Sequence, residues 1–498
     1  MADRSLHSLF SISWQSITYG IGVFGRQIII FLTLPLFTKY MSQDEYGAVS
    51  LITVFYVFLN TFTNSGLPAA TFRLYKDTND PQVRKSTIGA SQILFFLFAF
   101  VVALGIIAFA MPLSELLLNN PDYARALQIV AVLLIFDTMF NFGQILLRIQ
   151  MRPLVSSLQS LFLLIGQTAL ALLFVRVYDF GVTGYYLGYL CGAILGLFSI
   201  TWFVRKMLVF RIPLRRMKNI LIYGVPLVPA TLSITALRLA SRYLVGSLAG
   251  LDQVAIYDIG YKIGALVFIL VVPFRVAWPP FAFSVLHKPN AKKIYRDVAT
   301  YLATGCIFMM LVVLAFRSDL LRFMAPATYS DATRIIPWIA LSQIAWGLYP
   351  VLSLGPKITK TTYQLTWIAC IAAAVNFALN LLLIPRIGIL GAAIATFIGY
   401  WILTIITYIV GQRSYAIPLD WVRLGKLAIA GGAMAFLVLQ IDRLNNIGWQ
   451  GYPLKITSLL MFPILLALLG FVSPSQIKLL WNTGEVLIRE QLKQIHLL

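Results

Sequence analysis

Charged residues are scarce in this sequence. Asp, Glu, Lys and Arg make up only 11% of the 498 residues, whereas 59% of the residues are hydrophobic and the mean hydropathy is +0.84. A soluble chain of this length needs far more charge to cover the surfaces of its domains. The scarcity of charge therefore excludes an ordinary soluble protein.

Cysteine and histidine are also rare, with three residues of each. Cys191, Cys306 and Cys370 lie in apolar stretches without CxxC spacing, and we interpret them as packing residues. The histidines are far apart in the sequence, which gives no pattern for a metal site or a nucleophilic triad. A Walker A sequence is absent, so nothing indicates direct use of ATP. We therefore expect no catalytic residues, no metal and no cofactor.

Long apolar runs are abundant instead. About fourteen runs have the length of roughly 18–25 residues that spans a bilayer as a helix. They predict an all-α integral membrane protein. Their centres lie near residues 26, 55, 98, 136, 165, 192, 233, 267, 309, 343, 374, 398, 436 and 463.

The distribution of positive charge predicts the orientation in the membrane. With the N-terminus in the cytoplasm, most of the 39 Lys and Arg residues fall in cytoplasmic segments, and the acidic residues show no such bias. This asymmetry follows the positive-inside rule and places both termini in the cytoplasm. The basic run Arg205–Lys218 is then a cytoplasmic linker, and it also suits contact with anionic lipid head groups. The net charge of +21 therefore requires no nucleic-acid partner.

The sequence also contains an internal repeat. Weak matches at offsets of 204 and 206 residues join Ile17–Gly20 to Leu221–Gly224 and Tyr123 to Tyr329. Such offsets cover six spans, which predicts two six-helix lobes related in parallel about an axis along the membrane normal. We interpret the recurring glycines as helix-packing positions. Three glycine pairs share an offset of 207 residues: Gly181 and Gly388, Gly184 and Gly391, and Gly192 and Gly399.

These patterns predict five segments. They are an N-terminal lobe of spans 1–6 over residues 1–204, a basic cytoplasmic linker over 205–219, a C-terminal lobe of spans 7–12 over 220–411, spans 13–14 over 412–473, and an amphipathic cytoplasmic tail helix over 474–498.

Two stretches carry a resemblance to a known family. "YGIGVFGRQIIIFLTLPLFTKYMSQDEYGAVSL" (Tyr19–Leu51) resembles the opening of the polysaccharide-biosynthesis or oligosaccharide flippase family (Wzx-type). "NFALNLLLIPRIGILGAAIATFIGYW" (Asn376–Trp401) is similar to that family's second block. The resemblance covers nearly the whole chain and implies membership of the multidrug/oligosaccharidyl-lipid/polysaccharide (MOP) exporter superfamily.

The resemblance implies a fold and a task. The family fold is two six-helix lobes facing each other in a V, and the family moves polyprenyl-pyrophosphate-linked oligosaccharide between the leaflets of the cytoplasmic membrane. The implied partners are the lipid-linked oligosaccharide, membrane lipids, and glycosyltransferases or a polymerase of the same pathway. The resemblance leaves open the glycan and the choice between O-antigen, capsule, exopolysaccharide or teichoic-type precursor.

Four cations within the predicted spans are candidate substrate-binding residues. Arg26 lies in the first span, Arg238 and Arg242 lie one turn apart in the seventh, and Lys262 lies in the eighth. Ionisable residues at membrane depth are costly and usually face a cavity or a partner. Guanidinium groups suit pyrophosphate because they donate paired hydrogen bonds to phosphate oxygens. We therefore expect these cations to line a central cleft.

Other ionisable residues have two interpretations each. Asp137 binds a coupling cation, H⁺ or Na⁺, or pairs with a neighbouring arginine. Asp258, one turn before Lys262, either couples an ion or neutralises that lysine locally. A last group falls at cytoplasmic span ends, where orientation or snorkelling is the preferred interpretation and substrate binding is the secondary one. This group contains Arg73, Arg148 and Arg275.

Prolines in the proposed cleft spans predict bends that let the two lobes rock. They are Pro35, Pro226, Pro229 and Pro273.

Two rival functions are weighed against the flippase. A multidrug or cation antiporter of the same superfamily favours an acidic cleft, whereas the spans here carry a net positive charge. A membrane glycosyltransferase or polymerase is expected to need a long extramembrane segment with acid–base residues, and the external loops here reach only about twenty residues.

Overall fold

The computed structural model describes residues 25–64, 66–209, 213–443 and 451–471. Within these ranges the chain is helical and contains no β-strand, so the predicted all-α membrane fold is confirmed. Twelve of the described helices are long and apolar enough to cross a membrane, and a thirteenth span results when one bent helix pair is counted as a single span. The first predicted span begins outside the described residues, which show a helix over residues 25–40. The predicted tail helix over 474–498 lies outside them.

The N-terminal half contains the helix over residues 25–40 and ten further elements. They are α2 Gln43–Asn64, α3 Leu67–Lys76, α4 Pro81–Ala108, α5 Ala110–Leu118, η1 Pro121–Tyr123, α6 Ala124–Ile149, α7 Pro153–Arg176, α8 Gly181–Val204, η2 Arg205–Met207 and α9 Leu214–Gly224.

The C-terminal half follows α9 directly. Its elements are η3 Val225–Leu227, α10 Val228–Ala249, α11 Leu251–Gly264, η4 Ala265–Val267, α12 Phe268–Val285, α13 Ala291–Ala315, α14 Arg317–Met324, η5 Ala327–Arg334, α15 Ile336–Leu352, α16 Leu354–Ile358, α17 Tyr363–Ile387, α18 Ile389–Ser414, α19 Trp421–Arg443 and α20 Gly451–Leu468.

The two copies of the glycine motif have the same local structure. Gly181 and Gly388 have φ angles of +50° and +60°, in the left-handed region that glycine adopts without strain. Each lies where one helix turns into the next, α7 into α8 and α17 into α18. Gly184 then approaches Phe180 Cβ, and Gly391 approaches the backbone of Leu383 in the preceding helix, too closely to admit a side chain. The packing interpretation of the motif is therefore confirmed.

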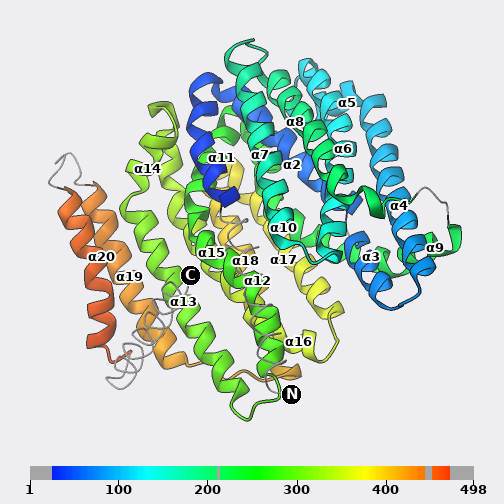
Figure 1. Ribbon diagram of the computed structural model, residues 1–498. Helices are drawn as coiled ribbons and strands as arrows, with labels where there is room; N and C mark the ends of the chain where they lie inside the picture. The colour runs from blue at the N-terminus through cyan, green and yellow to red at the C-terminus, as the bar shows by residue number, and fades with distance from the viewer. Residues whose placement is uncertain (1–24, 65, 210–212, 444–450, 472–498) are drawn as a thin grey trace, which may run out of the picture.

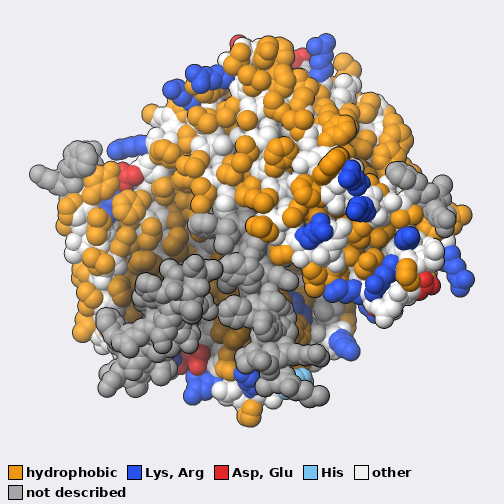
Figure 2. Space-filling model, viewed as in Figure 1, with side chains coloured by type: hydrophobic (Ala, Val, Ile, Leu, Met, Phe, Trp, Pro, Cys, Tyr) orange, Lys and Arg blue, Asp and Glu red, His pale blue; other side chains and the backbone are white. Residues whose placement is uncertain are grey.

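The helices α4–α8 gather on one side of the molecule, and most helices of the C-terminal half form the other side (Figure 1). Helices α19 and α20 lie at the outer edge of the C-terminal half, packed on α13. Hydrophobic side chains cover much of the face shown in Figure 2, as expected for a surface that contacts acyl chains. Helix α9 leads through η3 into α10 and packs on α3 and α4 of the same half.

Helix α2 makes the main contact between the halves, against α10 and α11. The contact depends on close approaches of backbone. A methyl group on Gly47 would overlap the carbonyl oxygen of Leu251, the first residue of α11. On the neighbouring helix α10, Gly246 leaves room for the side chain of Leu51. Small residues of this kind allow membrane helices to approach closely.

The contact at Gly47 yields a test of the interface. We expect Gly47→Ala to lower the melting temperature of the purified protein in detergent, because the added methyl forces α2 and α11 apart at a cost of about 1–3 kcal/mol. The measurement is a thermal unfolding curve. Gly105→Ala in α4 is the matched control, since a methyl there meets nothing within 4 Å. Equal melting temperatures for wild type and Gly47→Ala would contradict the described packing.

Candidate functional site

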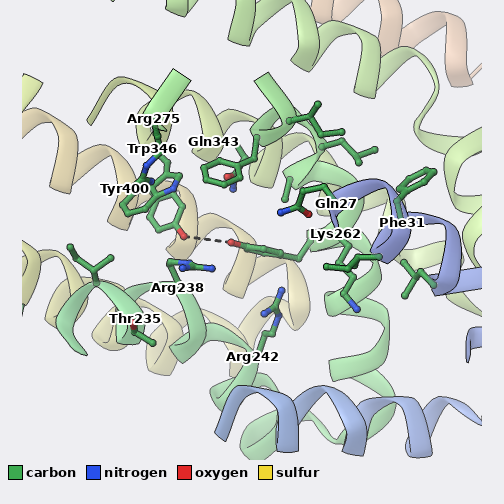
Figure 3. Close-up of a pocket in the computed structure, with 18 of the residues that line it drawn as sticks. Gln27, Phe31, Thr235, Arg238, Arg242, Lys262, Arg275, Gln343, Trp346 and Tyr400 are labelled. Carbon is green, nitrogen blue, oxygen red and sulfur yellow. Dashed lines mark hydrogen bonds between the residues drawn. The ribbon is translucent and has the colours of Figure 1, made fainter. Parts of the chain in front are cut away.

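The C-terminal half encloses a cavity of about 600 Å³ that we call the cationic cavity. Its walls come from α10, α11, η4, α12, α15 and α18, and the helix over residues 25–40 closes one side. Four cations reach it from three helices (Figure 3). They are Arg238 and Arg242 on α10, Lys262 on α11 and Arg275 on α12.

Local structure positions these cations. Arg238 and Arg242 are four residues apart on α10 and therefore project from one face of that helix. Pro226 and Pro229 lie at the junction of η3 and α10, and Pro273 lies inside α12 shortly after the 3₁₀ segment η4. The helices that carry the cations are thus interrupted near the cavity.

Two of the four cations form ion pairs with Asp258, whose side chain is only 4% exposed. Lys262 Nζ lies 2.7 Å from Asp258 Oδ2, and Arg242 Nε lies 2.9 Å from Asp258 Oδ1. Tyr46 of α2 joins the cluster. Its hydroxyl donates to Asp258 Oδ2 at 3.1 Å and accepts from Lys262 Nζ at 2.7 Å. The cluster therefore links the two halves of the molecule.

The other two cations have no carboxylate partner among the described residues. Arg238 is exposed to the cavity, and Arg275 places its guanidinium 4.5 Å from the ring centre of Trp346. The aromatic wall continues through Tyr400 and Tyr261, whose hydroxyl oxygens are 3.5 Å apart. Two unneutralised guanidinium groups in one partly enclosed cavity favour an anion. Planar guanidinium groups select phosphate or carboxylate oxygens.

A second cavity of about 480 Å³ lies within the N-terminal half, and we call it the amide cavity. Side chains from α2, α6 and α7 form it together with Arg26. Asp137 accepts hydrogen bonds there from the hydroxyl of Tyr56 and, at 3.3 Å, from Gln167 Nε2. The polar lining residues are Arg26, Tyr56, Asn60, Thr61, Asn64, Asp137, Asn141, Gln144, Arg148, Ser160 and Gln167.

The predicted site residues are thus divided between two cavities. Arg238, Arg242 and Lys262 line the cationic cavity together with the secondary candidate Arg275. Arg26 lines the amide cavity instead, although its neighbour Gln27 lines the cationic cavity. The sequence alone could not assign Arg26 and Gln27 to different cavities. Consecutive residues of a helix point about 100° apart, and the sequence does not show which face of this helix meets which half.

The remaining candidates have distinct surroundings. Asp137 and Arg148 both line the amide cavity. Arg73 lines neither cavity; its side chain is exposed, lies 3.7 Å from Asp77 and packs over the ring of Tyr223. No group of three or more His, Cys, Asp or Glu among the described residues is arranged to hold a metal ion.

Sequence reasoning missed the amide residues of the second cavity. Tyr56, Asn60 and Asn64 follow one another at intervals of four residues along α2, and Asn141 and Gln144 continue the helical face of Asp137 along α6. This periodicity in otherwise apolar spans was the available signal. Candidates taken only from the charged residues within the spans therefore miss these neutral polar residues.

The fold is that of a multi-pass membrane protein, and its described helices surround two cavities with polar linings. A family model described as polysaccharide biosynthesis protein matches residues 14–287, and the chain belongs to this family. Among curated proteins, no sequence matches the chain significantly.

Solved structures share the fold. The lipid II flippase MurJ, in an inward closed conformation, matches with a TM-score of 0.74 at 16% identity, covering 90% of this chain and 98% of that one. An inward-facing multidrug resistance MATE family transporter of the MOP superfamily has a TM-score of 0.66 at 13% identity, covering 78% and 94%. An outward-facing one has a TM-score of 0.63 at 14% identity, covering 81% and 95%.

The Asp258 cluster yields a second test. We expect Asp258→Asn to lower the melting temperature, because Arg242 and Lys262 then face each other without a counter-charge. The loss is about 2–3 kcal/mol, below the 3–5 kcal/mol of a fully buried pair, since the Lys262 side chain is 34% exposed. Thermal unfolding of the single variants and of Asp258→Asn/Lys262→Gln provides the measurement.

The double variant decides whether the charges are coupled. Removing Lys262 together with Asp258 should recover part of the lost stability. Asp331→Asn is the control, because that aspartate is exposed. Strictly additive effects in the double variant would show that Asp258 and Lys262 act independently.

Proposed function

We propose that the protein is a flippase that translocates polyprenyl-pyrophosphate-linked oligosaccharide across the cytoplasmic membrane for polysaccharide biosynthesis. The pyrophosphate binds in the cationic cavity, and the two lobes alternately open it to each side of the membrane. The observation that carries this proposal is the pair of arginines, Arg238 and Arg275, that lack a carboxylate partner among the described residues and line one cavity in a member of this family.

The charge of the cavity supports an anionic cargo. Burying guanidinium groups at membrane depth is costly unless an anion or water compensates them. Asp258 already accepts an ion pair from each of Arg242 and Lys262, so it does not neutralise Arg238 or Arg275. A diphosphate supplies the negative charge that would compensate these two arginines, and its oxygens can accept paired hydrogen bonds from their guanidinium groups.

The apolar part of the cavity supports a lipid-borne cargo. Ile30 and Phe31 project from the helix over residues 25–40, and Ile234, Leu266 and Ile269 project from the C-terminal half. A cavity that combines guanidinium groups with an apolar wall suits an amphiphile whose charged linkage adjoins a hydrocarbon chain.

Contacts between the halves at the expected external end support alternating access. The Thr38 hydroxyl donates to the carbonyl oxygen of Met324 at 2.6 Å, and Gln43 Nε2 donates to the carbonyl oxygen of Thr328 at 2.9 Å. Opening that end requires these bonds and the Tyr46–Asp258 bond to break, while the interrupted helices near Pro226 and Pro273 absorb the bend. The structurally similar MATE transporters have been solved facing inward and outward.

The proposal includes an organisation and an orientation. The lobes comprise residues 1–204 and 220–411, with a basic linker over 205–219, two further spans over 412–473 and a tail over 474–498. Both termini lie in the cytoplasm, as the positive-inside rule requires. Glycosyltransferases or a polymerase of the same pathway supply and consume the cargo.

A multidrug antiporter is the second candidate within the superfamily, and the MATE likeness favours it. The charge of the cavity argues against it for cationic drugs, because four cations and a single carboxylate bias the cavity towards anions. A transport experiment in proteoliposomes that offers both a lipid-linked oligosaccharide and a cationic dye distinguishes the two functions.

The central test measures leaflet transfer in proteoliposomes. With a polyprenyl-pyrophosphate-linked oligosaccharide as the probe, we expect Arg238→Gln and Arg275→Gln each to reduce the initial rate at least tenfold. Each variant removes a charge-assisted hydrogen bond, worth about 1.5–3 kcal/mol. Arg386→Gln is the control, because Arg386 is exposed at the end of α17 and lines neither cavity. Wild-type rates in both test variants, or uptake of a cationic dye in place of the lipid, would refute the assignment.

A crosslink tests the movement of the lobes. Gln43→Cys with Thr328→Cys, placed where the two halves meet, should form a disulfide that blocks transport, and reduction should restore it. The matched control is Ser233→Cys, whose oxygen already lies 3.1 Å from the sulfur of native Cys370 between α10 and α17 of one half. Crosslinking there should leave transport intact. Full transport by the oxidised Gln43→Cys/Thr328→Cys protein would rule out opening at this end.

A further inference from the structure

The amide cavity has a lining that the phosphate site does not explain. Tyr56, Asn60 and Asn64 form one polar stripe along α2, and Asp137 and Asn141 begin another along α6. In an apolar bundle, such polar stripes are costly to desolvate. Water or a polar ligand between them offsets this cost by forming hydrogen bonds with the side chains. At about 480 Å³ the cavity is of the size of small-molecule sites.

The amides retain unused hydrogen-bonding capacity. Asn141 has no hydrogen-bond partner in the described part of the chain, and its side chain is partly exposed to the cavity. Asn64 donates to the backbone oxygen of Asn60 at 2.9 Å, but its own Oδ1 is buried without a partner. Each side-chain amide offers both donors and an acceptor. That combination matches hydroxyl groups, which donate and accept at one atom.

The size of the cavity points away from an inorganic ion as the occupant, because its volume greatly exceeds that of an ion. Asp137 accepts hydrogen bonds from Tyr56 and Gln167, and Arg26 and Arg148 give the cavity a small net positive charge. Eight further lining residues are neutral and polar, and they can donate to and accept from hydroxyl groups. A polyhydroxylated molecule fits this lining.

We propose that the amide cavity binds the sugar portion of the cargo, while the cationic cavity holds its pyrophosphate. This inference rests on the proposed function. It adds which residues contact the sugar and which contact the pyrophosphate. The helix over residues 25–40 lies between the two subsites, because Gln27 lines one cavity and Arg26 the other. Asn141 and Asn64 are the residues assigned to sugar hydroxyls.

Binding by the full-length protein in nanodiscs tests the division with two probes. One probe is a bare polyprenyl pyrophosphate, and the other is the same lipid with an oligosaccharide attached to its pyrophosphate. We expect Asn141→Leu and Asn64→Leu each to raise the Kd of the oligosaccharide probe about fivefold, the loss expected for one hydrogen bond, and to leave the Kd of the bare lipid unchanged. Arg238→Gln should raise both Kd values.

Controls separate a lost contact from a damaged fold. Asn141→Ala removes the amide without adding bulk and should behave as Asn141→Leu does, whereas Asn141→Gln should retain most of the affinity. Asn290→Leu alters an exposed asparagine outside both cavities and should change neither Kd. Melting temperatures are compared for every variant.

The outcomes are distinguishable from failure of the flippase assignment itself. Equal Kd values of the two probes for the wild type, or parallel losses for both probes in Asn141→Ala, would overturn the sugar subsite alone. An unchanged Kd for both probes in Arg238→Gln would instead overturn the phosphate site on which the proposed function rests.

Discussion

The cost of an unpaired polar group at membrane depth governs this structure. Helices satisfy their own backbone, so the cost falls on side chains, which must find a partner or line a cavity. Asp258 meets this requirement through two cations and a tyrosine, and the buried Thr404 hydroxyl meets it by donating to the backbone oxygen of Ala345. Arg238 and Asn141 meet it by lining cavities. The residues that line the cavities without a protein partner are therefore the candidates for binding a ligand.

The two halves supply the frames of the two cavities. Positive φ angles occur at Gly181 and Gly388, near the starts of α8 and α18. The cavities nevertheless differ in chemistry, since one places cations against aromatic rings and the other is lined by amides. Two such surfaces suit the proposed cargo, whose two ends differ in the same way.

The sequence predicted the class of fold well because the bilayer imposes a strong and local signal. Apolar runs, the charge bias and the glycine repeat each depend on a physical rule that acts along the chain. The pairing of Lys262 with Asp258 was one of two open interpretations, and helical spacing made it visible. The position of Tyr46 in that cluster could not be predicted, because it depends on contact between segments 212 residues apart. The assignment of Arg26 and Gln27 to separate cavities likewise depends on tertiary packing.

The helix over residues 25–40 serves as a shared partition. Because neighbouring residues project about 100° apart, any turn of this helix about its own axis alters the polarity of both compartments together. A ligand that turned the helix on filling one compartment would change the affinity of the other, and by reciprocity the change would have equal size in each direction. Under the proposed function, the two parts of the cargo would then bind and leave together.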